Sequence, residues 1–332
     1  MRIAVDAFGT DKAPYPEVEG SIQAIKEDLC DEIILVGDEH ILQAELDKYY
    51  YDHNRIRIYH ASERIEMQDH AAEAVRMKKD SSMVKTVELH KNGEADAALS
   101  AGNSGAFMAA SLLAYGRIKG VSRPAIAAAL PTTIEQPAIL LDMGANVDCD
   151  AENLLQFAQL GSIYFTYCYH KPNPRVGLLN IGEESTKGNA LTREAYGLLS
   201  AAKDLNFIGN IEGKEILSGK FEVIVCDGFV GNVVLKTIEG VVRAVFDMLK
   251  EQLEKDWIAK IGAILSFPAY SFLKRKLDHT EFGGALLLGL NGTSIVCHGS
   301  SDAKAIKNAI RFAVRTVQSG FVQHSKDYFR ER

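Results

Sequence analysis

The chain of 332 residues lacks any stretch of about eighteen uninterrupted apolar residues, the length that a membrane-spanning helix needs. Its first residues, MRIAVDAFG, lead directly into a strand-like run, without the basic and long apolar segments of a secretory signal. We therefore expect a cytoplasmic protein. Neither absence excludes attachment to one surface of a membrane.

An excess of basic charge is also missing. The 37 Lys and Arg residues are outnumbered by 44 Asp and Glu residues, for a formal net charge of -7. A nucleic-acid-binding face needs a surplus of Lys and Arg, so no nucleic-acid partner is expected. The five cysteines include no CxxC pair, and some have apolar neighbours, as in IVCDG and IVCHG. Such scattered thiols indicate a reduced cytosolic protein without disulfides.

What the sequence does contain is a regular alternation of short β-rich runs and longer helical patterns. In the helical patterns apolar residues recur three and four positions apart, as in Val234, Ile238 and Val241. Near-continuous apolar strands alternating with helices indicate an α/β fold with a mostly parallel sheet covered on both faces. Strands are expected at about 2–7, 32–38, 55–61, 95–102, 125–130, 138–145, 175–182, 221–228 and 293–299, and helices at about 16–29, 39–49, 85–92, 104–118, 150–169, 189–203, 230–254 and 301–319.

Six of these strands end alike, with small residues followed by Asn, Asp or Ser where a helix is expected to begin. The strand ends read VDAFGTD, LSAGNSG, LDMGAN, LNIGEE, VCDGFVGN and VCHGSS. In open α/β sheets, ligands bind beyond the carboxyl ends of strands, where helix N-termini present free N–H groups. Glycines let the backbone approach a ligand closely. The turns therefore predict a ligand site, and ordinary tight turns are the alternative.

The turn in LSAGNSGAF combines hydroxyls, an amide and flexible backbone immediately before an Ala-rich helix. Free N–H groups and the helix dipole favour an anion at such a turn. It is not a P-loop, because no Gly-Lys-Ser/Thr follows, and it is not the dinucleotide fingerprint. The expected anion contacts are Ser100, Gly102, Asn103, Ser104 and Gly105.

Two further turns carry groups that can handle charge or protons. Asp227, in DGFVGN, can bind a cation, act as a base or cap the following helix. His298, in CHGSS, is either a hydrogen-bonding and proton-handling group or a structural residue. Its neighbour Cys297 is not expected to be a nucleophile activated by His298, because adjacent strand residues point to opposite faces.

The stretch LLNIGEESTKGN, residues 178–189, has two interpretations. Its carboxylates, Glu183 and Glu184, suit a metal ion, whereas Lys187 and the glycine backbone suit a phosphate. A metal site usually gathers several hard oxygen ligands, and Asp227 is the only evident distant one. We therefore favour phosphate and expect no metal. Asn180, Gly182 and Gly188 are expected to shape the loop, and the two glutamates to orient Lys187 or cap a helix.

Eight motifs cover essentially the whole chain in order: MRIAVDAFGTDKAP, LSAGNSGAFMA, RPAIA, LLDMGANVDC, LLNIGEESTKGN, VCDGFVGNVVLKT, FGGALLLGLNG and CHGSSD. Together they resemble the bacterial phosphate acyltransferase family PlsX. The resemblance implies that inorganic phosphate attacks the thioester of a long-chain acyl carrier protein, giving an acyl phosphate and free carrier protein. The acyl phosphate then feeds a glycerol-3-phosphate acyltransferase in phospholipid (phosphatidic acid) synthesis.

The resemblance also implies a fold similar to that of the isocitrate and isopropylmalate dehydrogenases and the phosphotransacetylases. This is a three-layer α/β/α assembly of two intimately joined lobes on a mixed sheet, forming a homodimer without a cofactor. We expect a single domain, 1–332, with lobes at about 1–125 plus 285–332 and at 126–284. Lys187, Asn180, Asp227 and His298 are the catalytic candidates. The further phosphate-binding candidates are Asp6, Gly9, Asp11, Asn146, Gly182, Glu183, Gly188, Gly228 and Asn232.

The first motif departs from the family, which usually reads Asp-Ala-Met-Gly-Gly-Asp-His-Ala-Pro. This chain has Phe8, Thr10 and Lys12 in place of Met, the second Gly and His. If that glycine has positive φ, Thr10 would be strained by on the order of 1–3 kcal/mol. Lys12 would replace the histidine as a cation and not as a proton acceptor near neutral pH.

Residues 251–277, EQLEKDWIAKIGAILSFPAYSFLKRKL, have a different character. Basic residues flank bulky apolar ones, and Pro268 is expected to break the segment into two short helices. A basic-flanked amphipathic hairpin can lie in a bilayer interface, while a helical pair in the core or in a dimer interface is the alternative. With the resemblance we expect peripheral membrane association, and the basic end can also meet an acidic carrier protein. The expected membrane contacts are Trp257, Ile261, Ile264, Leu265 and Phe267.

Three other functions stay open from the residues alone. A dehydrogenase of the same fold is opposed by the lack of an arginine-rich cluster for a tricarboxylate. A phosphotransacetylase that uses coenzyme A shares the chemistry, and only the motif set favours the carrier protein. A non-catalytic, membrane-associated scaffold of lipid synthesis would need none of the loop residues.

Overall fold

The computed structural model describes residues 1–255 and 257–331. Its centre is one mixed sheet of 11 strands in the order β3-β2-β1-β4-β11-β10-β5-β6-β9-β7-β8. The strands are β1 (Arg2–Asp6), β2 (Glu32–Gly37), β3 (Ile56–His60), β4 (Ala97–Ser100), β5 (Ala125–Leu130), β6 (Ala138–Leu141), β7 (Arg175–Asn180), β8 (Asn206–Glu212), β9 (Val223–Val225), β10 (Ala285–Leu288) and β11 (Ser294–Val296). The helices are α1 (Tyr15–Lys26), α2 (Glu39–Leu46), α3 (Ala71–Met77), α4 (Ser82–Lys91), α5 (Ser104–Tyr115), α6 (Ala151–Cys168), α7 (Ala190–Ala201), α8 (Gly228–Lys255), α9 (Trp257–Leu265), α10 (Phe267–Leu277), α11 (Ala303–Gln318) and α12 (Phe321–Arg330), with short 3-10 turns η1 (Gly213–Glu215) and η2 (His279–Phe282).

The sheet contains two parallel blocks that run in opposite directions. Strands β3, β2, β1, β4 and β11 are mutually parallel, and so are β6, β9, β7 and β8. Between the blocks, β10 is antiparallel to both of its neighbours, and β5 is antiparallel to β6. The carboxyl ends of the two blocks therefore lie at opposite edges of the sheet. We call the edge after β1, β4 and β11 the first edge, and the edge after β6, β7 and β9 the second edge.

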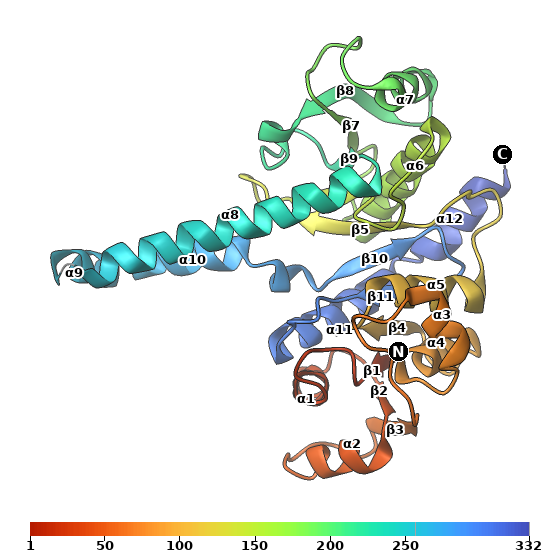
Figure 1. Cartoon of the computed structure of the whole chain (residues 1–332), viewed down its shortest axis with the longest axis vertical. Helices are drawn as coiled ribbons and strands as arrows, with labels where there is room; N and C mark the ends of the chain where they lie inside the picture. The colour runs from red at the N-terminus through yellow and green to blue at the C-terminus, as the bar shows by residue number, and fades with distance from the viewer. Residues whose placement is uncertain (256, 332) are drawn as a thin grey trace.

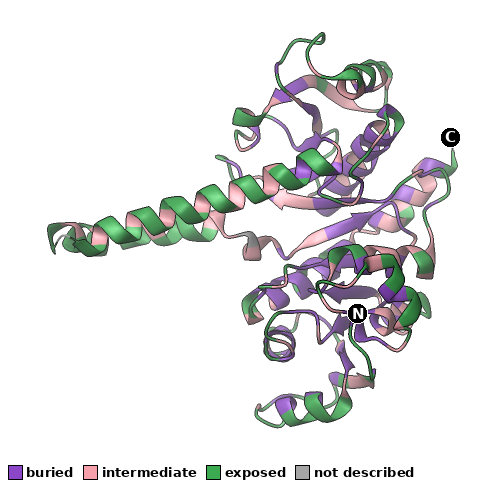
Figure 2. Ribbon diagram, viewed as in Figure 1, coloured by how far each residue is buried: buried purple, intermediate pink, exposed green. Residues whose placement is uncertain are grey.

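Helices cover both faces of the sheet, and each face has its own apolar core. Along β6, Ile139 and Leu141 belong to one core and Leu140 to the other, as expected because successive strand residues point to opposite faces. The first core also contains buried residues of α1, α6 and α11, and the second contains residues of α4 and α5. Figure 2 shows the buried residues concentrated in the sheet and its adjoining helices. The predicted three-layer α/β/α fold with a mixed, mostly parallel sheet is therefore confirmed.

The helices α8, α9 and α10 form an arm that projects from the body (Figure 1). α8 starts directly after β9 at the second edge and has 28 residues, a length of about 42 Å at 1.5 Å per residue. α9 follows it at the tip, and α10 returns toward the body, with the break between these two helices at Ser266. Beyond Gly231 no described residue of the arm is buried. None of the described helices is both long and apolar enough to span a bilayer.

Candidate functional site

The turns after β1, β4 and β11 meet at the first edge. Gly9 lies directly against the turn after β4, since a Cβ on it would come within 2.8 Å of the backbone nitrogen of Gly102. The Asp11 N–H donates to the carbonyl of Gly299, 2.8 Å away, in the turn after β11. His298, in the same turn, is exposed, as is Asp11. The candidate residues of these three turns thus lie together.

Asp6 and Ser100 support these turns from the inside. The Ser100 hydroxyl donates to Asp6 Oδ2 at 2.6 Å and accepts from the Gly102 N–H at 3.1 Å. Both side chains are buried. Burial raises the pKa of Asp6, and the hydrogen bond from Ser100 opposes that rise. Their positions fit a role in holding the turn in shape, because a ligand at the surface does not reach them.

The turn before α5 presents backbone N–H groups and the exposed side chain of Ser104, while the side chain of Asn103 is engaged in capping the helix. Asn103 is the N-cap of α5: its Oδ1 accepts from the Ala106 N–H at 3.0 Å, and its amide nitrogen donates to the carbonyl of Met67 at 3.0 Å. Ser104 and Gly105, which follow it, are exposed. First-turn N–H groups have no partner within their own helix. These two positions are therefore where an anion can approach α5.

Thr10, in the turn after β1, does not carry the strain considered for it. Among the described residues, the non-glycine residues with positive φ are Asp28, His170 and Asn173. Thr10 is buried, and its N–H and hydroxyl both donate to the carboxylate of Glu17, at 2.8 and 3.0 Å. Thr10 therefore fits at the position where the family usually has glycine, and its hydrogen bonds to Glu17 hold the loop in place. Lys12 is exposed at the same turn.

Lys236 is a candidate that the sequence analysis missed. Its Nζ lies 3.3 Å from His298 Nε2, and His298 Nδ1 lies 2.7 Å from the hydroxyl of Ser300. Since α8 starts at the second edge and Lys236 contacts a turn of the first, the helix connects the two. The signal was present, because Lys236 follows Asn232 by four residues and Gly228 by eight in VCDGFVGNVVLKT, the spacing of one helix face.

At the second edge, the fully buried Asp142 organises the turn after β6. Its Oδ1 accepts from the N–H groups of Ile126 and Ala145, at 3.0 and 3.2 Å. Its Oδ2 accepts from the backbone and side-chain nitrogens of Asn146, at 2.7 and 2.9 Å. Burial raises the pKa of Asp142 against these hydrogen bonds. Gly228, the first residue of α8, donates to the carbonyl of Asn146 at 2.8 Å, so the N-terminus of α8 is fixed on this turn.

Asp227 and Asn232 belong to the same junction. Asp227 Oδ1 accepts from the Val230 N–H at 2.9 Å, which is the hydrogen bond of a helix N-cap. Asn232 is exposed, and a Cβ on Gly144 would lie 3.6 Å from its Cβ. Within the described residues, a hydrogen bond thus supports capping as a role of Asp227.

The loop after β7 closes on itself. The Asn180 amide donates to the carbonyl of Lys187 at 3.2 Å. Gly188 has a φ of 100°, and a Cβ there would lie 2.5 Å from Asn180 Oδ1, so the closure requires glycine. Gly182 is buried under the stem of Lys187, while Lys187 and Glu183 are exposed. The loop therefore presents the lysine to solvent on a constrained backbone.

The six candidate turns thus divide between two edges. Asp6, Gly9, Asp11, residues 100–105 and His298 lie at the first edge. Asn146, Asp227, Asn232 and the Lys187 loop lie at the second, where β9 separates β6 from β7. Neighbouring strands are about 4.8 Å apart, so the Lys187 loop lies on the order of 10 Å from the turn after β6. No contact joins Lys187 to His298 in the part of the chain that the structure describes. Nor does any group of three or more His, Cys, Asp or Glu there suit a metal ion.

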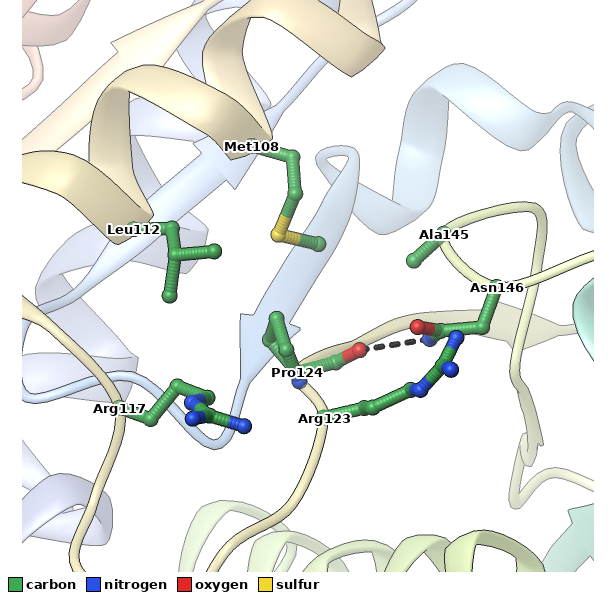
Figure 3. Close-up of a pocket in the computed structure, with 7 residues that line it drawn as sticks. All are labelled: Met108, Leu112, Arg117, Arg123, Pro124, Ala145 and Asn146. Carbon is green, nitrogen blue, oxygen red and sulfur yellow. Dashed lines mark hydrogen bonds between the residues drawn. The ribbon is translucent and has the colours of Figure 1, made fainter. Parts of the chain in front are cut away.

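A pocket of about 460 Å³ adjoins the second edge (Figure 3). Figure 3 shows Met108 and Leu112 reaching into it from α5, opposite the turn that carries Asn146. The Asn146 amide donates to the carbonyl of Pro124 at 2.7 Å, which fixes the turn after β6 to the start of β5 on the side of the pocket opposite α5. The lining residues are Met108, Leu112, Arg117, Arg123, Pro124, Ala145 and Asn146.

Solved structures with the same architecture define the class of protein. A phosphotransacetylase from Streptococcus pyogenes aligns with a TM-score of 0.62 over 96% of this chain and 94% of its own, at 16% identity. A protein described as a 4-hydroxythreonine-4-phosphate dehydrogenase from Salmonella typhimurium aligns with a TM-score of 0.54 over 95% and 99%, at 11% identity. The chain is therefore an α/β protein with the fold of the phosphotransacetylases and related dehydrogenases.

Sequence comparison identifies the family. The family model described as "Fatty acid synthesis protein" matches residues 1–324. Relatives named "Phosphate acyltransferase" include one from Heliobacterium modesticaldum, 52% identical over 97% of this chain and 96% of its own length. Another, from Geotalea daltonii, is 50% identical over 100% of this chain and 95% of its own length. The chain belongs to the phosphate acyltransferase family and is a transferase enzyme, as the motifs predicted.

Proposed function

We propose that this enzyme moves a long-chain acyl group from the thioester of acyl carrier protein to inorganic phosphate. The product, an acyl phosphate, would supply a glycerol-3-phosphate acyltransferase and so phosphatidic acid synthesis. The observation that carries the proposal is the similarity to phosphate acyltransferases over nearly the whole chain. The exposed helix N-terminus at Ser104 and Gly105 supports it, because such a terminus suits an anion.

In this reaction a phosphate oxygen attacks the thioester carbonyl carbon. The carbon–sulfur bond then breaks, and the thiolate of the carrier leaves and takes up the proton that the attacking hydrogen phosphate loses. Phosphate is itself nucleophilic, so no covalent enzyme intermediate is needed. The protein has to hold phosphate against the carbonyl, which lowers the barrier by several kcal/mol. It also has to stabilise the developing oxyanion, where each well-placed donor contributes about 3 kcal/mol.

Two lysines are candidates for the phosphate or oxyanion contact, one for each edge. Lys187 is exposed on the closed loop after β7, and Asn180 and Gly188 hold that loop in shape. Lys236 stands beside His298, so a cation and a proton-handling ring act together at the first edge. We keep Lys187 as the proposed contact and Lys236 as its alternative.

The reaction is tested by phosphate-dependent release of free carrier protein from palmitoyl-acyl carrier protein, without added metal and with hydroxylamine to trap the product. Release together with an acyl hydroxamate, both requiring phosphate, is expected. Turnover of palmitoyl-coenzyme A alone would instead assign a phosphotransacetylase-like donor. If the folded protein turns over neither thioester, the non-catalytic scaffold of lipid synthesis becomes the favoured function.

The two lysines are separated by parallel substitutions. Lys187→Ala is expected to lower turnover at least roughly a hundredfold, the effect of losing one oxyanion or phosphate donor. Lys203→Ala removes an exposed lysine beyond the C-terminal end of α7, away from the loop, and is expected to leave turnover unchanged. If Lys187→Ala keeps full activity and Lys236→Ala loses it, the contact belongs to the first edge and Lys187 is removed from the mechanism.

The arm motivates two further parts of the proposal, a homodimer and a peripheral attachment to the cytoplasmic surface of a membrane. Its exposed apolar side chains support both, because a soluble monomer rarely leaves a large apolar surface uncovered. The membrane contacts proposed are Trp257, Ile261, Ile264, Leu265 and Phe267, all exposed on α9 and the start of α10.

A further inference from the structure

The pocket beside the second edge has a chemistry that the reaction steps above do not use. Met108, Leu112, Pro124 and Ala145 give it apolar walls. Its volume of about 460 Å³ falls in the range of roughly 300–1,000 Å³ that is typical of small-molecule sites. A ligand that fills it therefore needs an apolar body, which inorganic phosphate lacks.

The rim of this pocket is basic. Arg117 and Arg123 line it, with Lys119 between them in the stretch GRIKGVSRP, which contains no acidic residue. All three side chains are exposed, although the whole chain has a net charge of -7. Arg117 donates to the carbonyl of Ser122, and Arg123 to that of Asp148 at 3.3 Å. A guanidinium has five N–H donors, so within the described residues each arginine keeps most of them for an anion.

The apolar wall extends along α5. Met108 and Leu112 follow Ser104 by four and eight residues, so the three lie on one face of the helix. α5 has 12 residues, a length of about 18 Å. A ligand lying along this face would run from the arginines toward the exposed N-terminus of α5. Its far end would then lie at the first edge, the edge of Lys236 and His298, which favours Lys236 over Lys187 as the contact at the reacting group. Such a ligand needs an anionic end and an extended, largely apolar arm.

We propose that the pocket receives the phosphate-bearing end of the pantetheine arm that carries the acyl thioester. This inference rests on the proposed function, because it assigns the carrier of that reaction's thioester. The phosphate accepts from the guanidinium groups of Arg117 and Arg123, and the arm lies on Met108 and Leu112. Acyl carrier protein and coenzyme A share this arm. An acidic carrier protein is also complementary to the basic rim.

The test uses the double variant Arg117→Gln and Arg123→Gln with palmitoyl thioesters of carrier protein, of coenzyme A and of pantetheine without phosphate. The KM for the two phosphate-bearing thioesters is expected to rise at least about tenfold, the loss of one or more charged hydrogen bonds. The KM for the phosphate-free thioester and for inorganic phosphate is expected to stay the same. Arg76→Gln, at an exposed arginine of α3, is the matched control, and equal Tm values confirm intact folding.

Every other outcome overturns the assignment. An equal loss with the phosphate-free thioester would mean that the arginines do not recognise the phosphate of the arm. A loss confined to carrier protein would place the effect on a protein–protein contact, and a raised KM for inorganic phosphate would assign the pocket to that substrate. An unchanged KM would leave the arginines without a role.

Binding separates this inference from the proposed function. If wild-type enzyme turns over none of the thioesters, the proposed function fails, but calorimetric titration with free 4′-phosphopantetheine still tests the pocket. Binding to wild type that weakens at least about tenfold in the double variant supports the assignment. Equal binding to both proteins, or none to either, contradicts it.

Discussion

Glu17 is a carboxyl group with 0% exposed surface in the first turn of α1. Burial raises its pKa from 4.5 to about 7, against the hydrogen bonds that it accepts from Thr10. Asp6 and Cys297 are titratable groups that interact with it. Because Glu17 anchors the turn that carries Asp11, its protonation state links pH to the stability of the first edge.

We predict that Glu17 makes the free energy of unfolding depend on pH between about 4.5 and 7. A raised pKa in the folded state gives stability that is complete below the unfolded pKa and is lost as pH rises through the folded one. The difference between the pKa of 4.5 in the unfolded state and about 7 in the folded state corresponds to a loss of roughly 3 kcal/mol in the free energy of unfolding as pH rises. Glu17→Gln keeps a neutral partner for Thr10, so its stability should fall less between pH 4.5 and 8.

Urea unfolding of both proteins at several pH values measures the difference. Asp6, whose pKa is also raised by burial, remains in both proteins, and its charge raises the pKa of Glu17. The difference between the two curves therefore measures Glu17 together with its coupling to Asp6. Parallel curves across this range would show that Glu17 is ionised in the folded protein.

At the scale of single residues, the sequence located the turns but not the contacts within them. Asn103 and Asp227 were predicted from their turns, and the structure shows both as helix caps. Lys236 and Asp142 were missed, since each acquires its role from a partner distant in sequence: His298 for the lysine, and Ile126 for the aspartate. Helix spacing indicates which residues share a face, but not what that face meets.

Among the elements, α9 and α10 differ most from the rest of the molecule. Ile264 and Leu265 are 73% and 78% exposed on α9, whereas the last turn of α10 carries Lys274, Arg275 and Lys276. Apolar side chains beside a basic turn are the combination that binds the interface of an anionic bilayer. The exposure of these residues favours a surface role over a place in the core.

We predict that Ile264→Glu combined with Leu265→Glu weakens binding to vesicles containing anionic lipid at least about tenfold, because each apolar side chain contributes roughly 1.5–3 kcal/mol when buried. Co-sedimentation with vesicles measures it. Met77→Glu, at an exposed methionine of α3, is the matched control and should bind like wild type. Equal binding by the double variant would assign α9 to another contact.

Sequence periodicity predicted most of the elements but missed β8, β10, α3 and α12. The strand β8, NFIGNIE, is an edge strand interrupted by Gly209 and lacks a regular alternation of buried and exposed residues. β10 is only ALLL, four apolar residues after two glycines, and so short a run does not distinguish strand from helix. These two strands are short or irregular segments that pairing with neighbouring strands stabilises.

For the whole molecule, the direction of β10 and β5 has the largest consequence. Because of these antiparallel pairings, the second block of parallel strands runs opposite to the first. Turns with similar sequences therefore lie at opposite edges of the sheet. The order of motifs along the chain could not show this, because a strand has the same apolar pattern in either direction. α8 is the element that reunites the halves, with its N-terminus on the turn of Asn146 and Lys236 beside His298.

The same helix carries an apolar stripe away from the body. Val241, Val245 and Met248 follow one another by four and three residues and are 56%, 51% and 58% exposed. This spacing places them on one face of α8. A stable dimer interface buries more than roughly 1,000 Å² in total, and a helix about 42 Å long is able to provide it when it packs against its copy.

We therefore predict that the protein is a dimer through α8, and that Val241→Glu combined with Val245→Glu shifts it to monomer. In a dimer formed through this stripe, the two introduced carboxylates of each chain would be buried against the same carboxylates of the other chain. The free-energy cost of burying this unpaired charge exceeds the free energy that the apolar contacts of the stripe contribute. Light scattering coupled to gel filtration gives the mass, 36.4 kDa for one chain.

The variant Ile264→Glu and Leu265→Glu, which changes only α9, should remain dimeric. If the Val241→Glu and Val245→Glu variant stays dimeric, the dimer interface lies elsewhere. If the wild-type protein is a monomer, the apolar stripe contacts the membrane or another partner instead.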